Sequence, residues 1–422
     1  MLLIRNGYVI DPADRTEGVR DLWIDEEKGI IAPAGAGKEA DRVIDASGLV
    51  VSPGLVDVHV HFRDPGFTDK EDILTGAKAA AKGGFTSVVM MANTRPTIDN
   101  AETLRYVLEK GAGTGIRAYA CVNVTKGMKG RELTDLRALF RQGAVGMTDD
   151  GVPILDEALV REAMRISAEL GIPISFHEED PQYIRNPGYN HGAASEHFGI
   201  YGADRMAEIA MIQRDLKLAA EEGGRIDIQH ISTAEGVALV REAKAAGTDV
   251  HAEATPHHFT LTEEAAIRYE TNAKMNPPLR TEADRLAIIE GLRDGTIDMI
   301  ATDHAPHTEG EKAAGLTQAP SGITGLETSL ALGITELVDQ GYLSMQQLLH
   351  RMSTGPAQVY HLDAGTLAEG KAADLVLFDP KKQWTVTKEG FASKATNSPF
   401  IGWELTGQVQ YTICGGRVIY QV

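Results

Sequence analysis

Short apolar runs alternate with longer amphipathic stretches through the middle of the chain. Each run is followed by a polar or glycine-rich break, and then by apolar residues at a spacing of three to four. Short runs of this kind are typical of buried strands, and the spacing is typical of helices. The pattern predicts eight strands: Leu55–His61, Thr86–Asn93, Arg117–Val124, Ala144–Asp150, Pro173–His177, Arg225–His230, Asp249–Thr255 and Asp298–His304.

The intervening stretches carry helix start and stop signals. In DKEDILTGAKAAAKGG, Thr68 or Asp69 is the expected N-cap and Gly83 the stop, while DEALVREAMRISAELG and STAEGVALVREAKAAG end at Gly171 and Gly247. Strands that alternate with helices favour parallel pairing, and eight of them predict an α/β fold built on a closed (β/α)8 TIM-type barrel. An open doubly wound sheet is the alternative, but no GxGxxG turn follows the first strand.

The two ends of the chain show strand and turn signals with few helical patterns. Examples are LLIRNGYVID near the start and ADLVLFDP and VQYTICGGRVIYQ near the end. We expect one small β-sandwich domain made from both termini, with residues 1–51 and 361–422 flanking a barrel of residues 52–360. The alternative is two unrelated edge hairpins.

Composition narrows the class of protein. The chain has 422 residues, a formal charge of −19 and a pI of about 5.1, which makes nucleic acid and anionic membranes poor partners. Cys121 and Cys414 are the only cysteines and form no CxxC pattern, which fits a reducing compartment. With no signal-like start and no apolar run of transmembrane length, a cytoplasmic protein is expected. An anionic substrate would need local positive groups against this overall charge.

Histidines and carboxylates gather where the predicted strands end. His59 and His61 share one face because alternate residues of a strand point the same way, and Arg63 would join them if the strand continued. The other strand ends carry Asp149 and Asp150, His177, His230 and Asp303. Active-site residues of such barrels come from the C-terminal ends of the strands.

Four imidazoles and two carboxylates suit a borderline divalent metal such as zinc and are enough for two ions. A carboxylate can bridge two cations, and either Asp149 or Asp150 is placed to do so. A metal lowers the pKa of bound water towards neutrality, and Asp303 could then act as general base and acid. The alternative for Asp303 is a helix N-cap.

Further polar residues at the same end of the barrel are candidates for anion binding. They are Arg63, Asn93 in MMANTRP, Asn276 in KMNPPLR, His307, and the glycines of APSGITG, Gly322 and Gly325. Glycine lets backbone amides approach a ligand closely. The polar segment Thr308–Pro320 is either a lid over bound substrate or an ordinary surface loop.

The motifs LVDVHVHFRDPG, MANTRPT, TDDG, HEED, IQHIS, NAKMNPPLR and ATDHAPH resemble those of the dihydroorotases, in their class I or long-chain bacterial form, within the amidohydrolase superfamily. The resemblance covers the whole chain, including GTLAEGKAADLVLFDP in the terminal β-domain. HxH alone is shared with hydantoinases, allantoinases and deaminases, whereas HFRDPG with NAKMNPPLR and TDHAPH is narrower.

The resemblance implies roles for individual residues. It implies metal ligation by His59, His61, Asp150, His177, His230 and Asp303, with one or two Zn²⁺ ions per subunit. Many relatives have a carboxylated lysine at the bridging position, where this chain has an aspartate. Substrate contacts would come from His61, Arg63, Asn93, Asn276, His307, Ser321 and Gly322. Some relatives differ at Ser321, so its backbone is the expected contact.

The implied reaction is the reversible cyclisation of N-carbamoyl-L-aspartate to L-dihydroorotate in pyrimidine (UMP) biosynthesis, with a metal-activated hydroxide and Asp303 as general acid and base. One alternative is another cyclic amidohydrolase of the allantoinase or dihydropyrimidinase type, which would need no arginine for a substrate carboxylate. The other is a non-catalytic barrel that scaffolds aspartate transcarbamoylase. A homodimer and an association with aspartate transcarbamoylase are the partner candidates, and the sequence leaves the oligomeric state open.

Overall fold

The computed structural model describes residues 1–35 and 39–422, so residues 36–38 of the expected N-terminal part lie outside the described residues. Eight parallel strands form the central sheet in sequence order: β6 (Leu55–Val60), β7 (Phe85–Met90), β8 (Arg117–Val122), β9 (Gly146–Thr148), β10 (Ile174–Phe176), β11 (Ile226–Ile228), β12 (Val250–Ala254) and β13 (Met299–Ile300). A parallel bridge between Val60 and His304 closes the sheet, and the His61 amide donates to the His304 carbonyl at 2.9 Å. The predicted barrel is confirmed.

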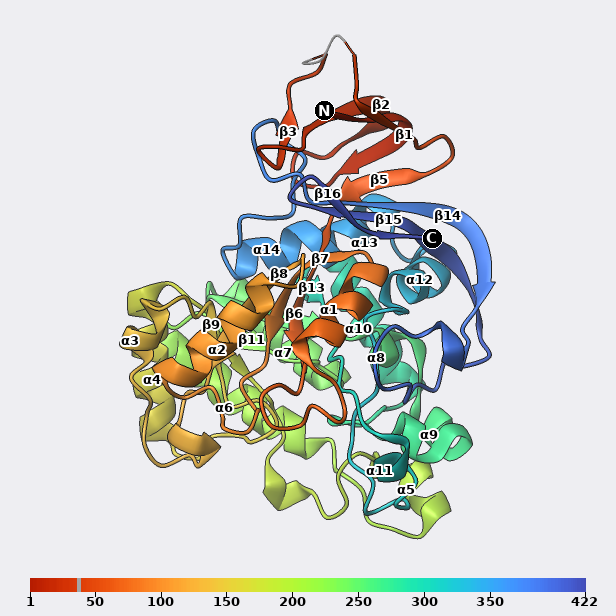
Figure 1. The fold of residues 1–422 in the computed structure, drawn as a ribbon. Coiled ribbons are helices and arrows are strands. Elements are labelled where there is room, and N and C mark those ends of the chain that lie inside the picture. The colour runs from red at the N-terminus through yellow and green to blue at the C-terminus, as the bar shows by residue number, and fades with distance from the viewer. Residues whose placement is uncertain (36–38) are drawn as a thin grey trace.

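Helices surround this barrel (Figure 1). They are α1 (Ile73–Lys82), α2 (Ala101–Ala112), α3 (Leu136–Phe140), α4 (Glu157–Leu170), α5 (Ala193–Phe198), α6 (Met206–Glu222), α7 (Ala234–Ala245), α8 (Pro256–Thr260), α9 (Glu263–Tyr269), α10 (Glu282–Asp294), α11 (Glu309–Lys312), α12 (Ser329–Gly333), α13 (Met345–Leu349) and α14 (Gly355–Val359). Shorter or wider turns occur at η1 (Lys126–Met128), η2 (Pro181–Tyr183), η3 (Glu270–Ala273), η4 (Ile334–Val338), η5 (His350–Thr354) and η6 (Lys388–Gly390). Every residue of β6 and β7 is buried, as expected for strands covered on both faces.

The predicted start of the first barrel helix is wrong. α1 begins at Ile73, and its N-cap is Asp72, whose carboxylate accepts the amides of Leu74 and Thr75. The Lys70 amide donates to the Phe67 carbonyl, so Thr68 and Asp69 lie in a turn before the helix. The stops at Gly83 and Gly171 are confirmed, and Gly171 takes the left-handed conformation at φ 67°.

Strands from both termini form a second, mostly antiparallel sheet, at the top of Figure 1. Its strands are β1 (Leu2–Asp11), β2 (Thr16–Asp25), β3 (Ile30–Ala32), β4 (Arg42–Asp45), β5 (Val50–Pro53), β14 (Leu375–Thr385), β15 (Glu404–Cys414) and β16 (Arg417–Gln421). β14 pairs antiparallel with β5, which joins the C-terminal strands to the N-terminal ones in one hydrogen-bonded sheet. Leu2, Ile4, Ile24, Leu375 and Ile413 lie in its own buried apolar core.

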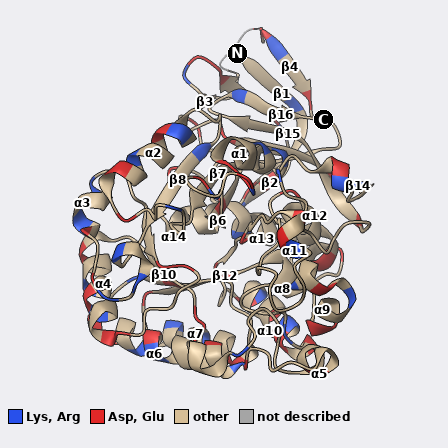
Figure 2. Ribbon diagram, turned by 60° about the horizontal axis from the view of Figure 1, so that its bottom comes forward, with Lys and Arg blue, Asp and Glu red and all other residues tan. Residues whose placement is uncertain are grey.

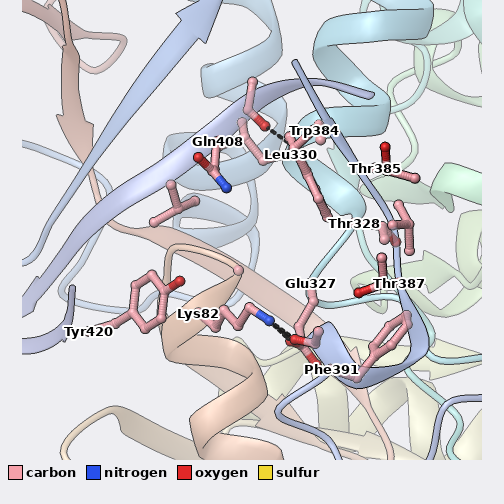
Figure 3. Close-up of a pocket in the computed structure, with 16 residues that line it drawn as sticks. Lys82, Glu327, Thr328, Leu330, Trp384, Thr385, Thr387, Phe391, Gln408 and Tyr420 are labelled. Atoms are coloured by element: carbon pink, nitrogen blue, oxygen red, sulfur yellow. Dashed lines mark hydrogen bonds and ion pairs between the residues drawn. The ribbon is translucent and has the colours of Figure 1, made fainter. Parts of the chain in front are cut away.

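The terminal sheet packs against the barrel around a cavity of about 190 Å³ (Figure 3). Trp384, Phe391 and Tyr420 line the cavity from the C-terminal part, and Lys82 and Glu327 line it from the barrel. Lys82 pairs with Glu327 at 3.0 Å, and the Glu327 carboxylate also accepts the backbone amides of Ala392 and Ser393. A buried carboxylate thus links the barrel to the C-terminal segment.

Acidic and basic segments are interspersed along the outer helices (Figure 2). Some charged side chains form ion pairs between neighbouring helices. Arg161 of α4, for example, pairs with Glu222 of α6 at 2.8 Å. Among the described residues, no helix combines the length and apolar character needed to cross a lipid bilayer.

Candidate active site

The predicted site residues lie at one end of the barrel, mostly just beyond the strands. Each strand ends earlier than predicted, so that His59 is within β6 whereas His61 follows β6, Asp150 follows β9, and Asp303 follows β13. His177 and His230 follow β10 and β11 in the same way. The structure brings all six candidate ligands together, and all six are buried.

Two clusters share one carboxylate. His59, His61 and Asp150 form the first cluster, and Asp150, His177 and His230 form the second, with ligand atoms within 4.8 Å of one another in each. Asp149 faces away from both, because its carboxylate accepts the Thr125 amide at 3.2 Å and the Asn123 amide at 3.3 Å. Asp150 is therefore the only one of the two neighbouring aspartates that could bridge two cations.

The spacing within the clusters fits bound cations. The His59 Nε2 atom is fully buried and has no hydrogen-bond partner within residues 1–35 and 39–422, yet it lies 3.6 Å from carboxylate oxygens of both Asp150 and Asp303. His177 and His230 approach the Asp150 Oδ1 atom at 3.7 and 3.8 Å. Such distances are too long for hydrogen bonds, whereas imidazole nitrogens and carboxylate oxygens around a small gap are the donor set that zinc-like ions bind.

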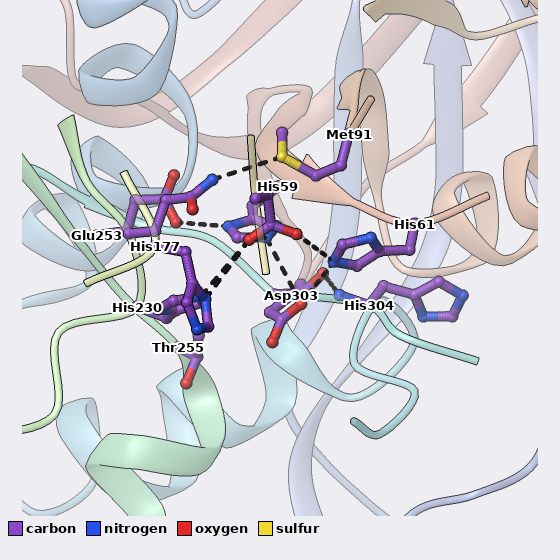
Figure 4. A network of polar contacts seen from close by, with 12 residues as sticks. His59, His61, Met91, His177, His230, Glu253, Thr255, Asp303 and His304 are labelled. Carbon is purple, nitrogen blue, oxygen red and sulfur yellow. Dashed lines mark hydrogen bonds and ion pairs between the residues drawn. The ribbon is translucent and has the colours of Figure 1, made fainter. Parts of the chain in front are cut away.

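The outward nitrogens of three imidazoles are held by neighbouring side chains, and Figure 4 shows one of these contacts, between His59 and Glu253. His59 Nδ1 bonds to Glu253 at 2.9 Å, His61 Nδ1 to Asn93 at 3.0 Å, and His177 Nε2 to Glu179 at 2.9 Å. Partners of this kind fix the tautomer and orientation of metal-binding histidines. Glu253 and Glu179 are missing from the sequence-based list; Glu253, a carboxylate inside the apolar strand β12, was a signal that could have identified one of them.

Asp303 contacts both imidazoles of the first cluster. Its Oδ1 atom lies 2.9 Å from His61 Nε2 and 3.6 Å from His59 Nε2. Burial opposes ionisation, but the hydrogen bond from His61 and the surrounding imidazoles hold the pKa of Asp303 well below its usual range. The residue is thus a carboxylate at neutral pH and can accept a proton.

A cavity of about 170 Å³ opens onto these clusters. The predicted substrate-binding residues His61, Arg63, Asn93, Asn276, His307, Ser321 and Gly322 all line it, together with Asp150, His177, His230 and Asp303. Asn93 also donates to the Asp150 carboxylate at 3.0 Å, and Ser321 Oγ donates to Asn276 Oδ1 at 3.0 Å. Gly325 lies outside this lining, and its amide donates to His304 Nδ1 instead.

Arg63 and His307 form the cationic and polar wall of the cavity. Arg63 lies beyond the end of β6, in a turn with φ 60°, so the turn rather than the strand brings it to the cavity. His230 and Asp303 also have positive φ, at 34° and 47°, a conformation that costs energy for non-glycine residues and is common at functional sites. Burial and the charges of Arg63 and Lys312 lower the pKa of His307 to about 2, so this imidazole is neutral and donates its Nε2 hydrogen to the Ser321 carbonyl at 2.8 Å.

The sequence profile of the Amidohydrolase family matches residues 50–419. Over the full length of both chains, the protein is 54% identical to a dihydroorotase of Clostridioides difficile (strain 630) and 50% identical to a dihydroorotase of Clostridium acetobutylicum. Among solved structures, an L-hydantoinase (dihydropyrimidinase) from Arthrobacter aurescens superposes with a TM-score of 0.89 at 25% identity, covering 100% of this chain and 96% of the other. A dihydropyrimidinase from Brevibacillus agri shares the fold, with a TM-score of 0.86 at 24% identity over 99% of this chain and 95% of the other.

Proposed function

The chain belongs to the amidohydrolase family, and its full-length relatives place it among the dihydroorotases; from this premise we propose which of its residues carry the reaction. The activity is the reversible cyclisation of N-carbamoyl-L-aspartate to L-dihydroorotate, a hydrolase reaction on a cyclic amide when run in reverse. The observation that supports the proposal is two histidine clusters that share Asp150, beside one cavity lined by Asp150, Arg63 and three of the four clustered histidines.

The residues that would hold the metal are His59, His61, Asp150, His177, His230 and Asp303, and Asp150 is the carboxylate that the two clusters share. Bound divalent ions would polarise the reacting carbonyl and lower the pKa of a water molecule. Zn²⁺, as one or two ions per subunit, is the proposed metal because nitrogen ligands from imidazole with a few carboxylate oxygens suit it.

Asp303 is the proposed general base and acid. In the hydrolytic direction it accepts a proton from the attacking water and passes it to the departing ring nitrogen. In cyclisation it accepts the proton of the attacking nitrogen and delivers it to the carboxylate oxygen that departs, and solvent supplies the second proton of the released water. Its contact with His61 holds the carboxylate at the edge of the cluster. The lowered pKa of Asp303 means that the carboxylate is ionised before the proton transfer begins.

Arg63 is the proposed partner of the substrate carboxylate that does not react, because a guanidinium binds a carboxylate through two parallel hydrogen bonds. His307 is a second proposed contact of this carboxylate, and Asn276 and the backbone of Ser321 and Gly322 would surround the ring. Asn93 is a further proposed contact of the substrate carboxylate. Its side-chain amide lies between His61 and Asp150 and contacts both.

The rate of L-dihydroorotate hydrolysis by purified protein tests the proposal, with allantoin and dihydrouracil as neutral-ring comparisons and a chelated sample as control. Turnover of dihydroorotate alone, lost with the metal and restored by Zn²⁺, is the expected result. Turnover of a neutral ring instead would agree with the assigned metal-binding residues but contradict the role of Arg63. No turnover by metal-replete protein would favour a scaffold for another enzyme.

A homodimer, an association with aspartate transcarbamoylase and a cytoplasmic location remain predictions from the sequence. Light scattering of the purified protein, alone and mixed with aspartate transcarbamoylase, would test the first two. A single-protomer mass for the protein alone would contradict the homodimer. The absence of a larger complex in the mixture would contradict the association.

A further inference from the structure

Asn397 lies outside the barrel in sequence, on the segment between β14 and β15, yet its side chain reaches the loop that follows β13. Its Oδ1 atom accepts the His307 backbone amide at 3.0 Å. Its Nδ2 atom donates to the carbonyls of Ala305 at 3.2 Å and Gly322 at 3.0 Å. The side chain is buried, with 6% of its surface exposed, so these three bonds are made away from bulk water.

All three residues that Asn397 binds line the active-site cavity. His307 and Gly322 both face it, and Gly322 has φ 121°, a conformation that favours glycine. A Cβ at Gly322 would lie 2.6 Å from the Ala305 Cβ atom. The backbone of the two segments is therefore in close contact where Asn397 holds it.

Lysines bind the same loop from its other side. Lys312 Nζ donates to the carbonyls of Pro320 at 2.9 Å and Gly322 at 3.0 Å, so the Gly322 carbonyl receives hydrogen bonds from both Asn397 and Lys312. Lys274 Nζ donates to the carbonyls of Leu316 and Ala319 at 2.8 and 2.7 Å, and its own carbonyl accepts the Gly322 amide at 2.9 Å. Protonated or not, a lysine amine has enough hydrogens for two such bonds.

These three hydrogen bonds require a carboxamide side chain at position 397. A carboxamide presents an acceptor and two donors, which matches one backbone amide and two carbonyls. A carboxylate of the same shape could accept from His307 but would face the Ala305 and Gly322 carbonyls without a hydrogen to donate. The bonding pattern thus links the position of His307 to the position of Gly322.

We propose that Asn397, acting with Lys312, is a positioning residue of the reaction that fixes His307 and the Gly322 backbone where the substrate carboxylate and ring bind. This inference rests on the proposed function. It assigns part of substrate binding to the C-terminal segment, which contributes no residue to the cavity itself. A misplaced wall would weaken substrate binding while the metal clusters and Asp303 stay in place.

The test compares Asn397→Asp, Asn397→Ala and Lys312→Met with Ser398→Ala, a buried neighbour whose hydroxyl accepts the Phe400 amide. We measure kcat and KM for L-dihydroorotate, bound metal and the melting temperature. Loss of one or two buried hydrogen bonds should raise KM about tenfold in each of the first three variants, with kcat within about threefold of wild type. Ser398→Ala should keep the wild-type KM.

A double variant, Asn397→Asp with Lys312→Met, gives a sharper readout. Both side chains bind the Gly322 carbonyl, so their effects on KM should combine to less than the product of the single effects. Unchanged KM in folded, metal-loaded Asn397→Asp and Lys312→Met proteins would overturn the inference. So would a loss of kcat that follows loss of metal. Absence of dihydroorotate turnover by the wild-type chain would overturn the proposed function itself, and the inference with it.

Discussion

Arg63 lines the cavity beside His61 and Asp303, and its Nε atom donates to the Pro306 carbonyl at 3.3 Å. We expect Arg63→Ala to lower kcat/KM for L-dihydroorotate by about 10- to 150-fold, since hydrogen bonds to a charged group contribute roughly 1.5–3 kcal/mol. Steady-state kinetics would measure the loss, with Arg95→Ala as the control because Arg95 is an exposed arginine outside the cavity lining. A variant with wild-type kinetics would assign the substrate carboxylate to another residue.

Asp303 can be tested without changing its shape. We expect Asp303→Asn to lower kcat by about 10²- to 10⁴-fold, because a carboxamide cannot accept the proton that general base catalysis transfers. Bound metal must be measured alongside, since Asp303 also contacts His59 and His61. Retained metal with lost turnover would separate the proton-transfer role from ligation, and retained turnover would contradict both.

At the scale of residues, the alternation of side chains along a strand and the positions where strands end were enough to identify candidate metal ligands. It located the histidines of the two clusters, but it could not choose between Asp149 and Asp150 without the resemblance to a family. Asn397 was missed because its partners, His307 and Gly322, lie far from it in sequence. The residues next to Asn397 in the sequence carry no signal for its role, because that role depends on contacts with another domain.

At the scale of elements, the eight strands were predictable because each is a short buried run, whereas their ends were not. The strands stop before the polar residues, and turns with positive φ, such as that of Arg63, carry the chain into the cavity. The N-cap of α1 was mispredicted because Thr68, Asp69 and Asp72 are all residue types that cap helices, and the structure uses Asp72, whose carboxylate accepts the amides of Leu74 and Thr75.

α11 ends at Lys312, whose titration should affect stability. Burial, with the nearby charge of Lys274, lowers the pKa of Lys312 from 10.5 to about 7, although Glu311 opposes the shift. Between these values the unfolded chain holds a proton that the folded chain has lost, so this group makes the free energy of unfolding rise with pH. The stabilisation is complete above the unfolded pKa and is lost as the pH falls through about 7.

Lys312→Met removes this titration. The difference in free energy of unfolding, wild type minus variant, should therefore increase from pH 7 to pH 9, at up to about 1.4 kcal/mol per pH unit. Urea unfolding at several pH values would measure it, with the exposed Lys381→Met as control. A difference that stays constant with pH would show that Lys312 keeps an ordinary pKa.

At the scale of the whole molecule, the barrel and the terminal sheet are joined through the C-terminal segment that carries Asn397. Glu327 holds this segment by accepting the amides of Ala392 and Ser393 at 2.9 and 3.1 Å. We expect Glu327→Ala to lower the free energy of unfolding by about 1–3 kcal/mol, because it leaves the amides of Ala392 and Ser393 without their acceptor and removes the ion pair with Lys82. It should also raise KM for dihydroorotate if the segment positions the cavity wall.

Urea unfolding and steady-state kinetics would check both effects, with Glu389→Ala as the matched control on an exposed carboxylate nearby. A destabilised variant with wild-type KM would show that the segment stabilises the fold without tuning the cavity. The two-part architecture was predictable because both terminal segments show strand and turn signals with few helical patterns. The docking contacts were not, because they join residues that are distant in the sequence, as Glu327 is from Ala392 and from Lys82.

The pairing of β5 with β14 has a consequence for how the chain is made. β5 leads into the first barrel strand, but its antiparallel partner is synthesised only after the whole barrel sequence. On the ribosome, one edge of β5 must therefore wait, with its backbone groups unpaired, while the barrel is translated. Unpaired strand edges recruit other strands, so nascent chains that stall before β14 should be the species most prone to aggregate.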